Sequence, residues 1–489
     1  MKTILKKTSV LMLFVILACS ALPIRVSASF EIPGTCRVQA DDGAAHTVKT
    51  LDYDYDHNTY LSLRDVAMVL KDTDKCFSLE ITKNSVSLNP GNSYTPLGGE
   101  NDPWEASENP DVSLRRNEIK INGEEVSYYT LIMSLPSGDY DCFMMAADLA
   151  MILDVNITVP AKGTLRVCTQ EPFAISPAAL EQAGYFREVN SVLAGDAATG
   201  EIYYQYQSDV PYPIASITKL MTCLLTMDAI SAGQISLEES VTISEAVEAL
   251  ADSSDGVIPL KAGDEITVEE LIIGALLPSS NECALCLAET IAGSEEAFVE
   301  RMNQKALELG LSQAVFYNCH GLPSFSEDPI PAKRQNRMSA EDLFRLVSYL
   351  LKVYPQITDI TSMKDATLES IDLEVRNTNP LLYNLPEVTG LKTGTTNKAG
   401  ACLVTSMVVD DGTMEHDLVV IVLGAESAIE RGRVSGLLAK YAQQAFHSGI
   451  EKTKDGRLGQ VPVEIPIRAE AAVDWIIRVA KSTDDEKNR

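Results

Sequence analysis

Histidine is scarce in this chain of 489 residues: there are five, and they are scattered along the sequence. Metal sites in proteins draw on clusters of histidine, cysteine and carboxylate ligands. Cys283 and Cys286 form one C-x-x-C pair, but there is no second pair to complete a set of four. The surrounding string ECALCLAETIAG is typical of a helix, so we interpret both cysteines as small buried hydrophobic residues. The sequence therefore predicts no metal site and no cofactor.

Basic residues are also in short supply. There are 40 Lys and Arg against 69 Asp and Glu, which gives a formal net charge of −29. Nucleic-acid binding takes much of its affinity from contacts between cations and phosphates, and anionic lipid attracts basic segments for the same reason. The charge balance excludes nucleic acid as a partner and argues against simple electrostatic attachment to a membrane.

Long apolar runs are limited as well. The run at residues 10–22 is short of the roughly 20 residues that a bilayer core requires. Three lysines precede this run, and Val26-Ser27-Ala28 follows it. This order is typical of a secretory signal peptide. We expect a signal peptide at residues 1–28, cleavage after Ala28 and an extracytoplasmic location, with a retained membrane anchor as the alternative.

Residues 30–170 have the pattern of a separate, smaller mixed α/β domain. Strand-like stretches alternate with short helical ones, and Asn122-Gly123 predicts a hairpin turn. The string DVAMVL at 65–70 is echoed by DLAMIL at 148–153, which indicates two copies of a unit of one helix and its strands. Four cysteines of this domain allow three disulfide pairings among themselves: Cys36, Cys76, Cys142 and Cys168.

This first domain resembles a known module. The strings YLSLRDVAMVL at 60–70 and NSYTPLGG at 92–99 are similar to the N-terminal stalk-like domain first described in copper amine oxidases. The resemblance implies a surface or wall-binding addition, with a plain spacer as the alternative. It brings no copper site, because no histidines cluster here.

The rest of the chain predicts a linker at 171–187 and a second domain at 188–446. A strand pair, a block of helices, three strands and a closing helix follow one another in this domain. Strands from both ends can then complete one antiparallel sheet, so we expect an α+β fold. The last segment, 447–489, has a strand-like string at 461–467 and an amphipathic helix around 473–480. That helix either lies on a membrane surface or packs against the domain, so membrane attachment stays open.

Three short strings in the second domain carry the chemistry: SITK at 216–219, SSN at 279–281 and KTG at 392–394. Each is weak evidence alone, because lone serine–lysine pairs are common on solvated helix faces. Two further S-x-N strings, at 87–89 and 107–109, show how often the second motif arises by chance. All three strings in one order indicate a serine enzyme whose base is a lysine.

The spacing explains how such a site would work. Ser216 and Lys219 lie one helical turn apart and therefore share a face. Lys219 can take the serine proton only when it is neutral, so its pKa must fall from about 10.4 toward 7–8. Burial and a second cation, Lys392, would both lower it.

The other two strings suit the remaining tasks. Ser279 can relay a proton, and Asn281 can hold Lys219 or the substrate amide. Lys392 and Thr393 suit a terminal carboxylate, and Gly394 allows close backbone approach at the end of a strand. The N–H groups of Thr395 and Ser216 can form an oxyanion hole.

These residues match a family. Residues 188–446 resemble the serine D-alanyl-D-alanine carboxypeptidases, the low-molecular-weight penicillin-binding proteins, in PIASITKLMT, LLPSSNECALCLAETIAGS, FYNCHGLP, RNTNPLL and VTGLKTGTTNKAG. The resemblance implies a β-lactamase/transpeptidase-like domain with a five-stranded antiparallel sheet and a helical cluster. It implies removal of the terminal D-alanine from peptidoglycan stem pentapeptides, covalent inhibition by β-lactams, and a place in the cell wall or on the outer face of the cell membrane.

The resemblance also assigns roles. It implies that Ser216 is the acylated nucleophile and Lys219 the general base, with Ser279 and Asn281 in the second motif. Substrate-binding roles fall to Lys392, Thr393, Gly394, Thr395 and Arg431. Arg433 competes with Arg431 for the carboxylate, and His320 is expected to be structural.

Three alternatives remain. A class A-like β-lactamase would need a deacylating glutamate, usually in E-x-x-L-N, and the sequence has no such string. A peptidoglycan endopeptidase would use the same scaffold to cut cross-links. A non-catalytic wall-binding protein would act through its first domain, although the intact set of motifs argues against that reading.

Overall fold

The structure is a computed structural model. It describes residues 31–448 except 54–57, 105–111, 136, 162, 174–185, 187–188, 326–332, 384, 411 and 413–414. The expected signal peptide, most of the expected linker, and the strand and helix expected at 461–467 and 473–480 lie outside the described residues. The chain divides into two compact units, Met1–Asn117 with Tyr129–Gln170 and Glu118–Tyr128 with Glu171–Arg489. Among the described helices, none combines the length and apolarity that a bilayer crossing requires.

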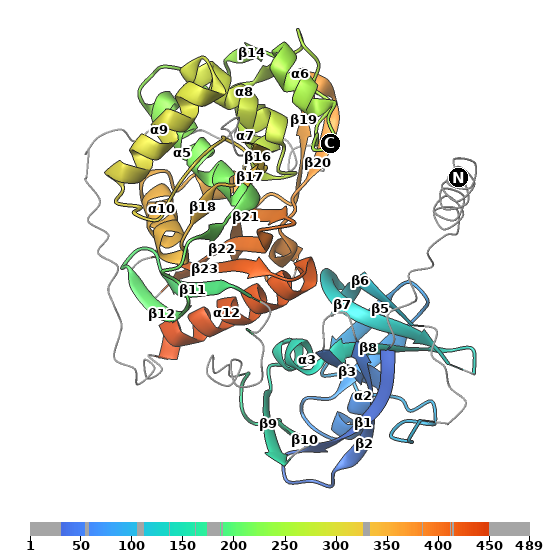
Figure 1. Cartoon of the computed structure of the whole chain (residues 1–489). Helices are drawn as coiled ribbons and strands as arrows, with labels where there is room; N and C mark the ends of the chain where they lie inside the picture. Colours follow the sequence, from blue (N-terminus) through green and yellow to red (C-terminus); the bar gives the residue numbers. More distant parts are fainter. Residues whose placement is uncertain are drawn as a thin grey trace, which may run out of the picture. The chain divides into compact units, whose positions relative to one another are not determined.

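The first unit is built on a ten-stranded sheet in the order β4-β5-β6-β7-β8-β3-β2-β1-β10-β9 (Figure 1). Strands β1 and β10 pair in parallel. The elements are β1 (Glu31–Ala40), β2 (His46–Tyr53), β3 (Asn58–Ser62), α2 (Leu63–Leu70), β4 (Phe77–Ile81), β5 (Val86–Pro90), β6 (Val112–Ile121), β7 (Glu124–Ser134), β8 (Tyr140–Met145), α3 (Ala146–Leu153), β9 (Asn156–Ala161) and β10 (Thr164–Cys168).

The predicted internal repeat is present in this unit. A strand, a helix and two strands follow one another in β3-α2-β4-β5 and again in β8-α3-β9-β10. The two echoed strings form the two helices, and β3 pairs with β8. The predicted hairpin turn is present between β6 and β7, where Asn122 and Gly123 both have positive φ, of 52° and 89°. Such a pair matches the twist of the flanking strands.

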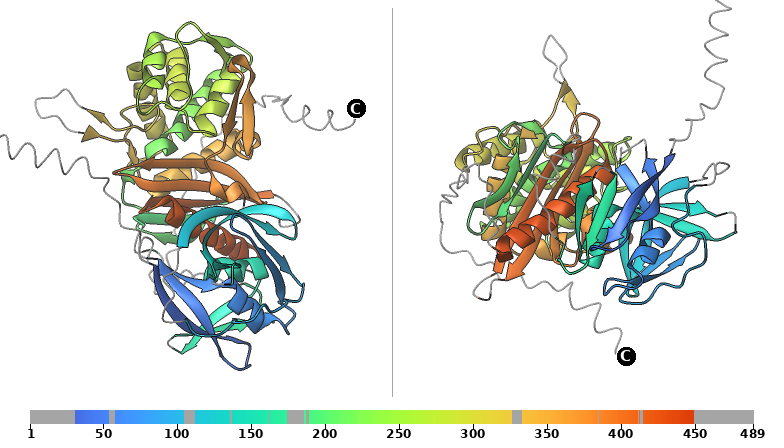
Figure 2. Two further views of the ribbon diagram at one scale, coloured as in Figure 1. Left: turned by 90° about the vertical axis from the view of Figure 1, so that its right-hand side faces the viewer. Right: turned by 90° about the horizontal axis from the view of Figure 1, so that it is seen from below.

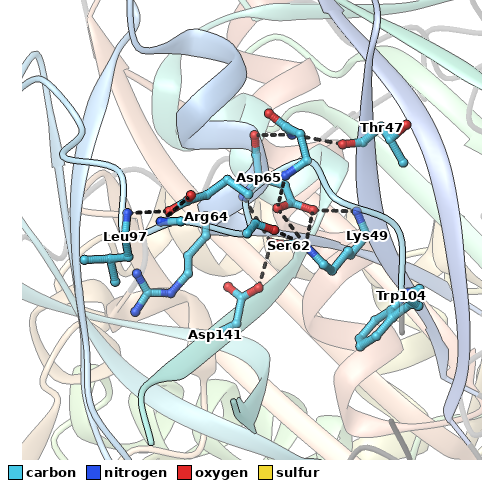
Figure 3. Close-up of polar contacts among 12 residues, drawn as sticks. Thr47, Lys49, Ser62, Arg64, Asp65, Leu97, Trp104 and Asp141 are labelled. Carbon is cyan, nitrogen blue, oxygen red and sulfur yellow. Dashed lines mark hydrogen bonds and ion pairs between the residues drawn. The ribbon is translucent and has the colours of Figure 1, made fainter. Parts of the chain in front are cut away.

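A buried polar network holds α2 on its sheet (Figure 3). Asp65, in the first turn of the helix, accepts hydrogen bonds from the backbone of Lys49 at 2.7 Å and of Asn101 at 2.9 Å. Ser62 caps the helix by accepting from the Asp65 N–H, and its hydroxyl donates to Asp141 at 2.7 Å. Burial raises the pKa of Asp141 to about 6. The string that resembles the stalk-like domain thus supplies the cap and the anchor of α2.

The second unit has a five-stranded antiparallel sheet in the order β12-β11-β23-β22-β21. Helix α12 covers one face, and a cluster of helices packs on the other (Figure 2). Strands from the start and the end of the domain therefore complete one sheet, which confirms the expected α+β fold. The five strands are β11 (Ser191–Asp196), β12 (Glu201–Tyr206), β21 (Val388–Thr396), β22 (Gly400–Asp410) and β23 (Glu415–Ala425).

The helices and short strands of this unit surround a core that continues from the sheet into the helical cluster. The helices are η1 (Ala215–Thr218), α5 (Lys219–Ser231), α6 (Glu245–Ala251), α7 (Val268–Leu276), α8 (Asn281–Ala292), α9 (Glu295–Glu308), α10 (Ala340–Val353), α11 (Ile357–Thr361), η2 (Glu369–Ile371), η3 (Pro380–Tyr383) and α12 (Ala428–Ser448). The short strands are β13 (Tyr212–Pro213), β14 (Ser240–Thr242), β15 (Glu265–Thr267), β16 (Ser324–Phe325), β17 (Lys333–Arg334), β18 (Arg337–Met338), β19 (Asp365–Leu368) and β20 (Leu373–Arg376).

Helix α5 lies at the centre of this cluster. The sequence suggested one apolar face, but the helix is buried all round from Lys219 to Met227. Cys283 and Cys286 are also buried, as expected of small hydrophobic residues. All nine described cysteines have free thiols, so none of the three pairings considered for the first domain is formed.

Candidate active site

The first motif lies where a 3-10 turn passes into the central helix. Ser216 belongs to η1, and Lys219 is the first residue of α5. Side chains three residues apart eclipse each other in a 3-10 turn, and Lys219 Nζ lies 3.0 Å from Ser216 Oγ. Ala215, directly before the serine, has φ 48°. Strained backbone of this kind gathers at active sites because the surrounding structure enforces it.

The Lys219 amine has two further partners. Asn281 Oδ1 lies 2.8 Å from Nζ, and the carbonyl oxygen of His320 lies 3.0 Å from it. The Asn281 Nδ2 group donates to the carbonyl of Asp255 at 2.8 Å, which directs Oδ1 toward the lysine. Both partners only accept hydrogen bonds. A neutral amine gives them its two N–H groups, so its lone pair must face the Ser216 hydroxyl.

The electrostatics of the pocket make that neutral form more accessible than it is in an exposed lysine. Lys219 is fully buried, and burial lowers its pKa to about 8, although Cys319 and the Glu282 carboxylate oppose the shift. Lys392 on β21 is buried as well. Burial and then the charge of Lys219 hold the pKa of Lys392 well below its usual value. Two amines in one buried pocket favour a neutral state for one of them.

The third motif lies within the edge strand β21, where the sequence placed it at a strand end. A Cβ atom on Gly394 would come within 2.8 Å of the Ile214 carbonyl oxygen and 2.9 Å of the Ser216 nitrogen. Gly394 is therefore required for packing within the chain, before any substrate binds, because η1 packs directly on β21. This contact fixes the distance between Ser216 and the strand.

Residues beside the third motif form polar contacts of their own. Arg431 on α12 donates to the Thr395 hydroxyl at 3.3 Å. Its competitor Arg433 forms a buried ion pair with Glu430 on the same helix. The structure thus brings Arg431, and not Arg433, to the edge strand.

Ser279 is placed less directly than the other motif residues. It is half-buried, and its φ of 71° is unusual for a serine. Within the described part of the chain, the hydrogen-bond partners of the Lys219 amine are Ser216, Asn281 and His320. The second motif therefore contacts the lysine through Asn281, and Ser279 lies at the strained turn that leads into α8.

Comparison with known proteins is consistent with this geometry. Residues 181–427 match the D-alanyl-D-alanine carboxypeptidase family, peptidase S11. The chain belongs to this family. It is 36% identical to the D-alanyl-D-alanine carboxypeptidase DacF of Bacillus subtilis over 247 residues, which are 50% of this chain and 59% of the relative.

Other relatives differ in the share of their length that is matched. The D-alanyl-D-alanine endopeptidase of Pseudomonas aeruginosa is 30% identical over 57% of this chain and 87% of its own length. A crystal structure of a peptidoglycan synthesis regulatory factor from Streptococcus pneumoniae is 34% identical, with a TM-score of 0.48, over 53% of this chain and 72% of the other. The chain covers 59%, 55% and 62% of three D-alanyl-D-alanine carboxypeptidases of this family.

The family's motifs do not include every residue that shapes this site. The His320 carbonyl binds the lysine, and the Thr378 hydroxyl lies 2.5 Å from that of Thr393. Glu282, directly after the second motif, accepts hydrogen bonds from the backbone of Val257 and Ile258. A backbone carbonyl such as that of His320 has no signature in sequence. The charge of Glu282 next to the second motif and the position of Thr378 in the RNTNPLL string were signals that could have identified these two residues.

Within the described residues, one set of three side chains has the chemistry and spacing of metal ligands. Glu295, Cys319 and His320 each offer a ligand atom, and these atoms lie within 4.8 Å of one another. The set lies next to the carbonyl that holds Lys219.

Proposed function

We propose that this chain is a serine D-alanyl-D-alanine carboxypeptidase that binds penicillin covalently. The substrate is the peptidoglycan stem pentapeptide, and the product is the tetrapeptide with free D-alanine. One observation carries the proposal: a buried amine with two pure acceptors has only the Ser216 hydroxyl left for its lone pair. Membership of the family supports the substrate class.

The first half of the reaction forms an acyl-enzyme. Neutral Lys219 takes the proton of Ser216, and Oγ attacks the carbonyl carbon of the penultimate D-alanine. The N–H groups of Ser216 and Thr395 stabilise the oxyanion; removal of one such donor typically costs about 10²–10³ in rate. The tetrahedral intermediate collapses as the peptide C–N bond breaks. Protonated Lys219, directly or through Ser279, returns the proton to the leaving amine.

The second half releases the product. Water loses a proton to Lys219 as its oxygen attacks the ester carbonyl, and Ser216 leaves as the hydroxyl after it regains that proton. The tetrapeptide departs with a new carboxylate. A β-lactam acylates Ser216 in the same way as the peptide does in the first half of the reaction. Its leaving amine, however, stays covalently attached to the acyl group.

The edge strand and its neighbours are suited to hold the peptide. One side of an edge strand presents a row of N–H and C=O groups that no neighbouring strand pairs. An extended substrate can therefore form backbone hydrogen bonds with β21. Thr393 and Arg431 are suited to bind the terminal carboxylate, and Arg431 is oriented by Thr395. Lys392 is buried beside Lys219, and burial and the charge of Lys219 hold the pKa of Lys392 well below its usual value.

Location and the first unit are part of the same proposal. A chain secreted through residues 1–28 would meet peptidoglycan outside the cytoplasm, in the cell wall or on the outer face of the membrane. The first unit would act there as a stalk-like module in contact with the wall. Amino-terminal sequencing of the mature protein tests cleavage after Ala28, and a pull-down of the first unit with purified peptidoglycan tests wall contact.

The decisive experiment is mass spectrometry of the protein after reaction with penicillin. The expected result is a mass gain on the peptide that contains Ser216, with none in Ser216→Ala. Digestion of muropeptides should release D-alanine from pentapeptides. Cleavage of cross-links would instead indicate the endopeptidase, which the Pseudomonas aeruginosa relative keeps as a second candidate. Rapid turnover of nitrocefin would indicate a β-lactamase.

A further inference from the structure

One acceptor of the Lys219 amine belongs to a segment outside the three motifs. The carbonyl of His320 lies 3.0 Å from Nζ, and the neighbouring carbonyl of Cys319 accepts the Thr222 hydroxyl at 2.5 Å. Lys219 and Thr222 are three residues apart on the same face of α5. The two consecutive carbonyls therefore hold one side of the central helix at the residue proposed as the base.

A single carboxylate oxygen holds this segment from the other side. Glu295 Oε1, on the first residue of α9, accepts from the Cys319 N–H at 3.0 Å and from the Cys319 thiol at 3.1 Å. The Nε2 atom of His320 lies 3.5 Å from the same carboxylate. Bonds to an ionised acceptor are roughly twice as strong as neutral ones.

The protonation state of His320 fits this arrangement. The N–H of Leu322 donates to His320 Nδ1 at 3.1 Å, so Nδ1 is an acceptor. Burial, and then the charge of Lys219, lower the pKa of His320 to about 3. The neutral ring therefore carries its proton on Nε2, the atom that faces Glu295. Two donors of Cys319 therefore bond the carboxylate, and the Nε2–H group of the next residue faces it at 3.5 Å.

We propose that Glu295 is a positioning residue for the base Lys219, acting through the backbone of Cys319 and His320. The carboxylate fixes the two residues. The His320 carbonyl then holds the amine, the Cys319 carbonyl holds Thr222 on the same face of α5, and the amine lone pair stays on the Ser216 hydroxyl. This inference rests on the function proposed above and adds a residue outside the motifs to its machinery.

The competing interpretation is that Glu295, Cys319 and His320 bind a zinc ion, because glutamate, cysteine and histidine are zinc ligands. The hydrogen bonds argue against it. A metal on Nε2 would require the ring proton on Nδ1, where the Leu322 N–H already donates. Metal binding would also have to displace the N–H and thiol donors that converge on Glu295 Oε1.

The test uses the full chain and saturation kinetics with fluorescent penicillin. These kinetics separate the acylation rate constant k2 from the Kd of the complex that precedes it. Glu295→Ala should lower k2 about 10²-fold with little change in Kd, since small misplacements at a reacting group cost that much. Glu295→Gln, which keeps an acceptor, should recover at least about tenfold of the loss. The matched control is Glu296→Ala, the next residue in the same helical turn, whose side chain is exposed.

Each outcome decides the inference. A loss of k2 restricted to Glu295→Ala, with recovery in Glu295→Gln, supports it. Equal k2 in the Glu295→Ala and Glu296→Ala variants overturns it. So does a loss that glutamine does not recover and that accompanies a matching fall in melting temperature, because Glu295 is then only structural.

Two further measurements complete the test. Stoichiometric zinc binding by the wild type that Glu295→Ala abolishes, with acylation sensitive to EDTA, would assign the cluster to a metal and overturn the inference. If Glu295→Ala does not fold, Glu295→Asp serves instead: its shorter reach should lower k2, and an unchanged k2 overturns the inference. Absence of any adduct on wild-type Ser216 would refute the proposed function itself.

Discussion

Asn281 Oδ1 lies 2.8 Å from Lys219 Nζ, and the Nδ2 group of the same amide donates to the Asp255 carbonyl. The second contact determines the orientation of the amide. The Asp255 carbonyl oxygen is an acceptor, so the group that lies 2.8 Å from it must be the Nδ2 donor and not the Oδ1 acceptor. The lysine therefore meets an acceptor on one side and the His320 carbonyl on another. A neutral amine donates one N–H to each of these two acceptors and keeps its lone pair for the Ser216 hydroxyl. The proposed transfer of the serine proton to Lys219 depends on this arrangement.

The first prediction concerns the pH dependence of acylation in the wild type. Burial lowers the pKa of Lys219 to about 8, and only the neutral amine can take the serine proton. The acylation rate should therefore rise about tenfold per pH unit below 8 and level off above it. Stopped-flow labelling with penicillin from pH 6 to 10 measures the profile. A rate that falls as pH rises through 8 would contradict the assignment of Lys219 as base.

The second prediction is that Asn281→Asp moves this profile to higher pH. A carboxylate at 2.8 Å would stabilise the ammonium form and raise the pKa of Lys219 by about 1–3. Acylation at pH 7 should then fall by about 10–10³-fold and recover in part at pH 10. Asn303→Asp is the control, because that amide also bridges backbone groups, at Val299 and Phe316, away from the lysine. An equal loss in both variants would show that amide bridging alone matters.

The third prediction is a change that lowers the pKa of Lys219, whereas Asn281→Asp raises it. Glu282 is fully buried, and its charge raises the pKa of Lys219. Glu282→Gln removes the charge but keeps an acceptor for the N–H groups of Val257 and Ile258. The pKa of Lys219 should fall, so the variant should acylate faster than the wild type at pH 6. The same labelling series measures the midpoint.

The control for Glu282 lies on a neighbouring helix. Glu270 on α7 is also buried and hydrogen-bonded to hydroxyl and backbone groups of Thr267 and Ser370. Glu270→Gln should leave the midpoint of the profile where it is. An upward shift in Glu282→Gln would mean that the carboxylate acts on the lysine in some way other than through its charge.

The fourth prediction tests the contact between η1 and β21. In Gly394→Ala the new Cβ would lie 2.8–3.1 Å from backbone atoms of Ile214, Ser216 and Ile217. The turn that carries Ser216 must move, so we expect acylation to fall about 10²-fold. In the control, Gly436→Ala on α12, the nearest atom is a side-chain carbon of Leu381 at 3.5 Å, and alanine suits a helix interior. Unchanged acylation in Gly394→Ala would show that η1 adapts without cost.

The fifth prediction concerns Thr378, whose hydroxyl lies 2.5 Å from that of Thr393. Thr378→Val removes the hydrogen-bond partner of the Thr393 hydroxyl, the group that we propose binds the substrate carboxylate. Loss of about 1 kcal/mol of binding corresponds to a KM about fivefold higher for a D-alanyl-D-alanine peptide. Thr378→Ser should restore the wild-type value. Steady-state kinetics with D-alanine release measures both, and a KM that does not respond to Thr378→Val would remove this residue from the site.

Local signals determined much of the fold from sequence. Asn122-Gly123 predicted a hairpin because only residues that tolerate positive φ suit such a turn, and the two echoed strings predicted two helices in equivalent places. Apolar segments of the second domain predicted α7 to α10 and the three final strands, since burial imposes its own period on helices and strands. The motif strings likewise predicted that Ser216, Lys219 and Asn281 act together.

Only the tertiary structure decided how those residues meet. From sequence, Lys392 was predicted both to bind a carboxylate and to act as a second cation near Lys219, and Gly394 to allow close approach of a substrate. The folded chain buries the Lys392 amine near Lys219, and the packing of η1 on β21 requires the glycine before any substrate binds. The family resemblance named Arg431 for the carboxylate and left Arg433 as a competitor. In the structure, α12 carries Arg431 to Thr395 and leaves Arg433 paired with Glu430. The His320 carbonyl reaches Lys219, the Cys319 carbonyl reaches Thr222, and the Glu295 carboxylate reaches the Cys319 N–H only because distant segments pack together. Backbone groups have no sequence signature, and contacts across 24 to 101 residues arise only on folding.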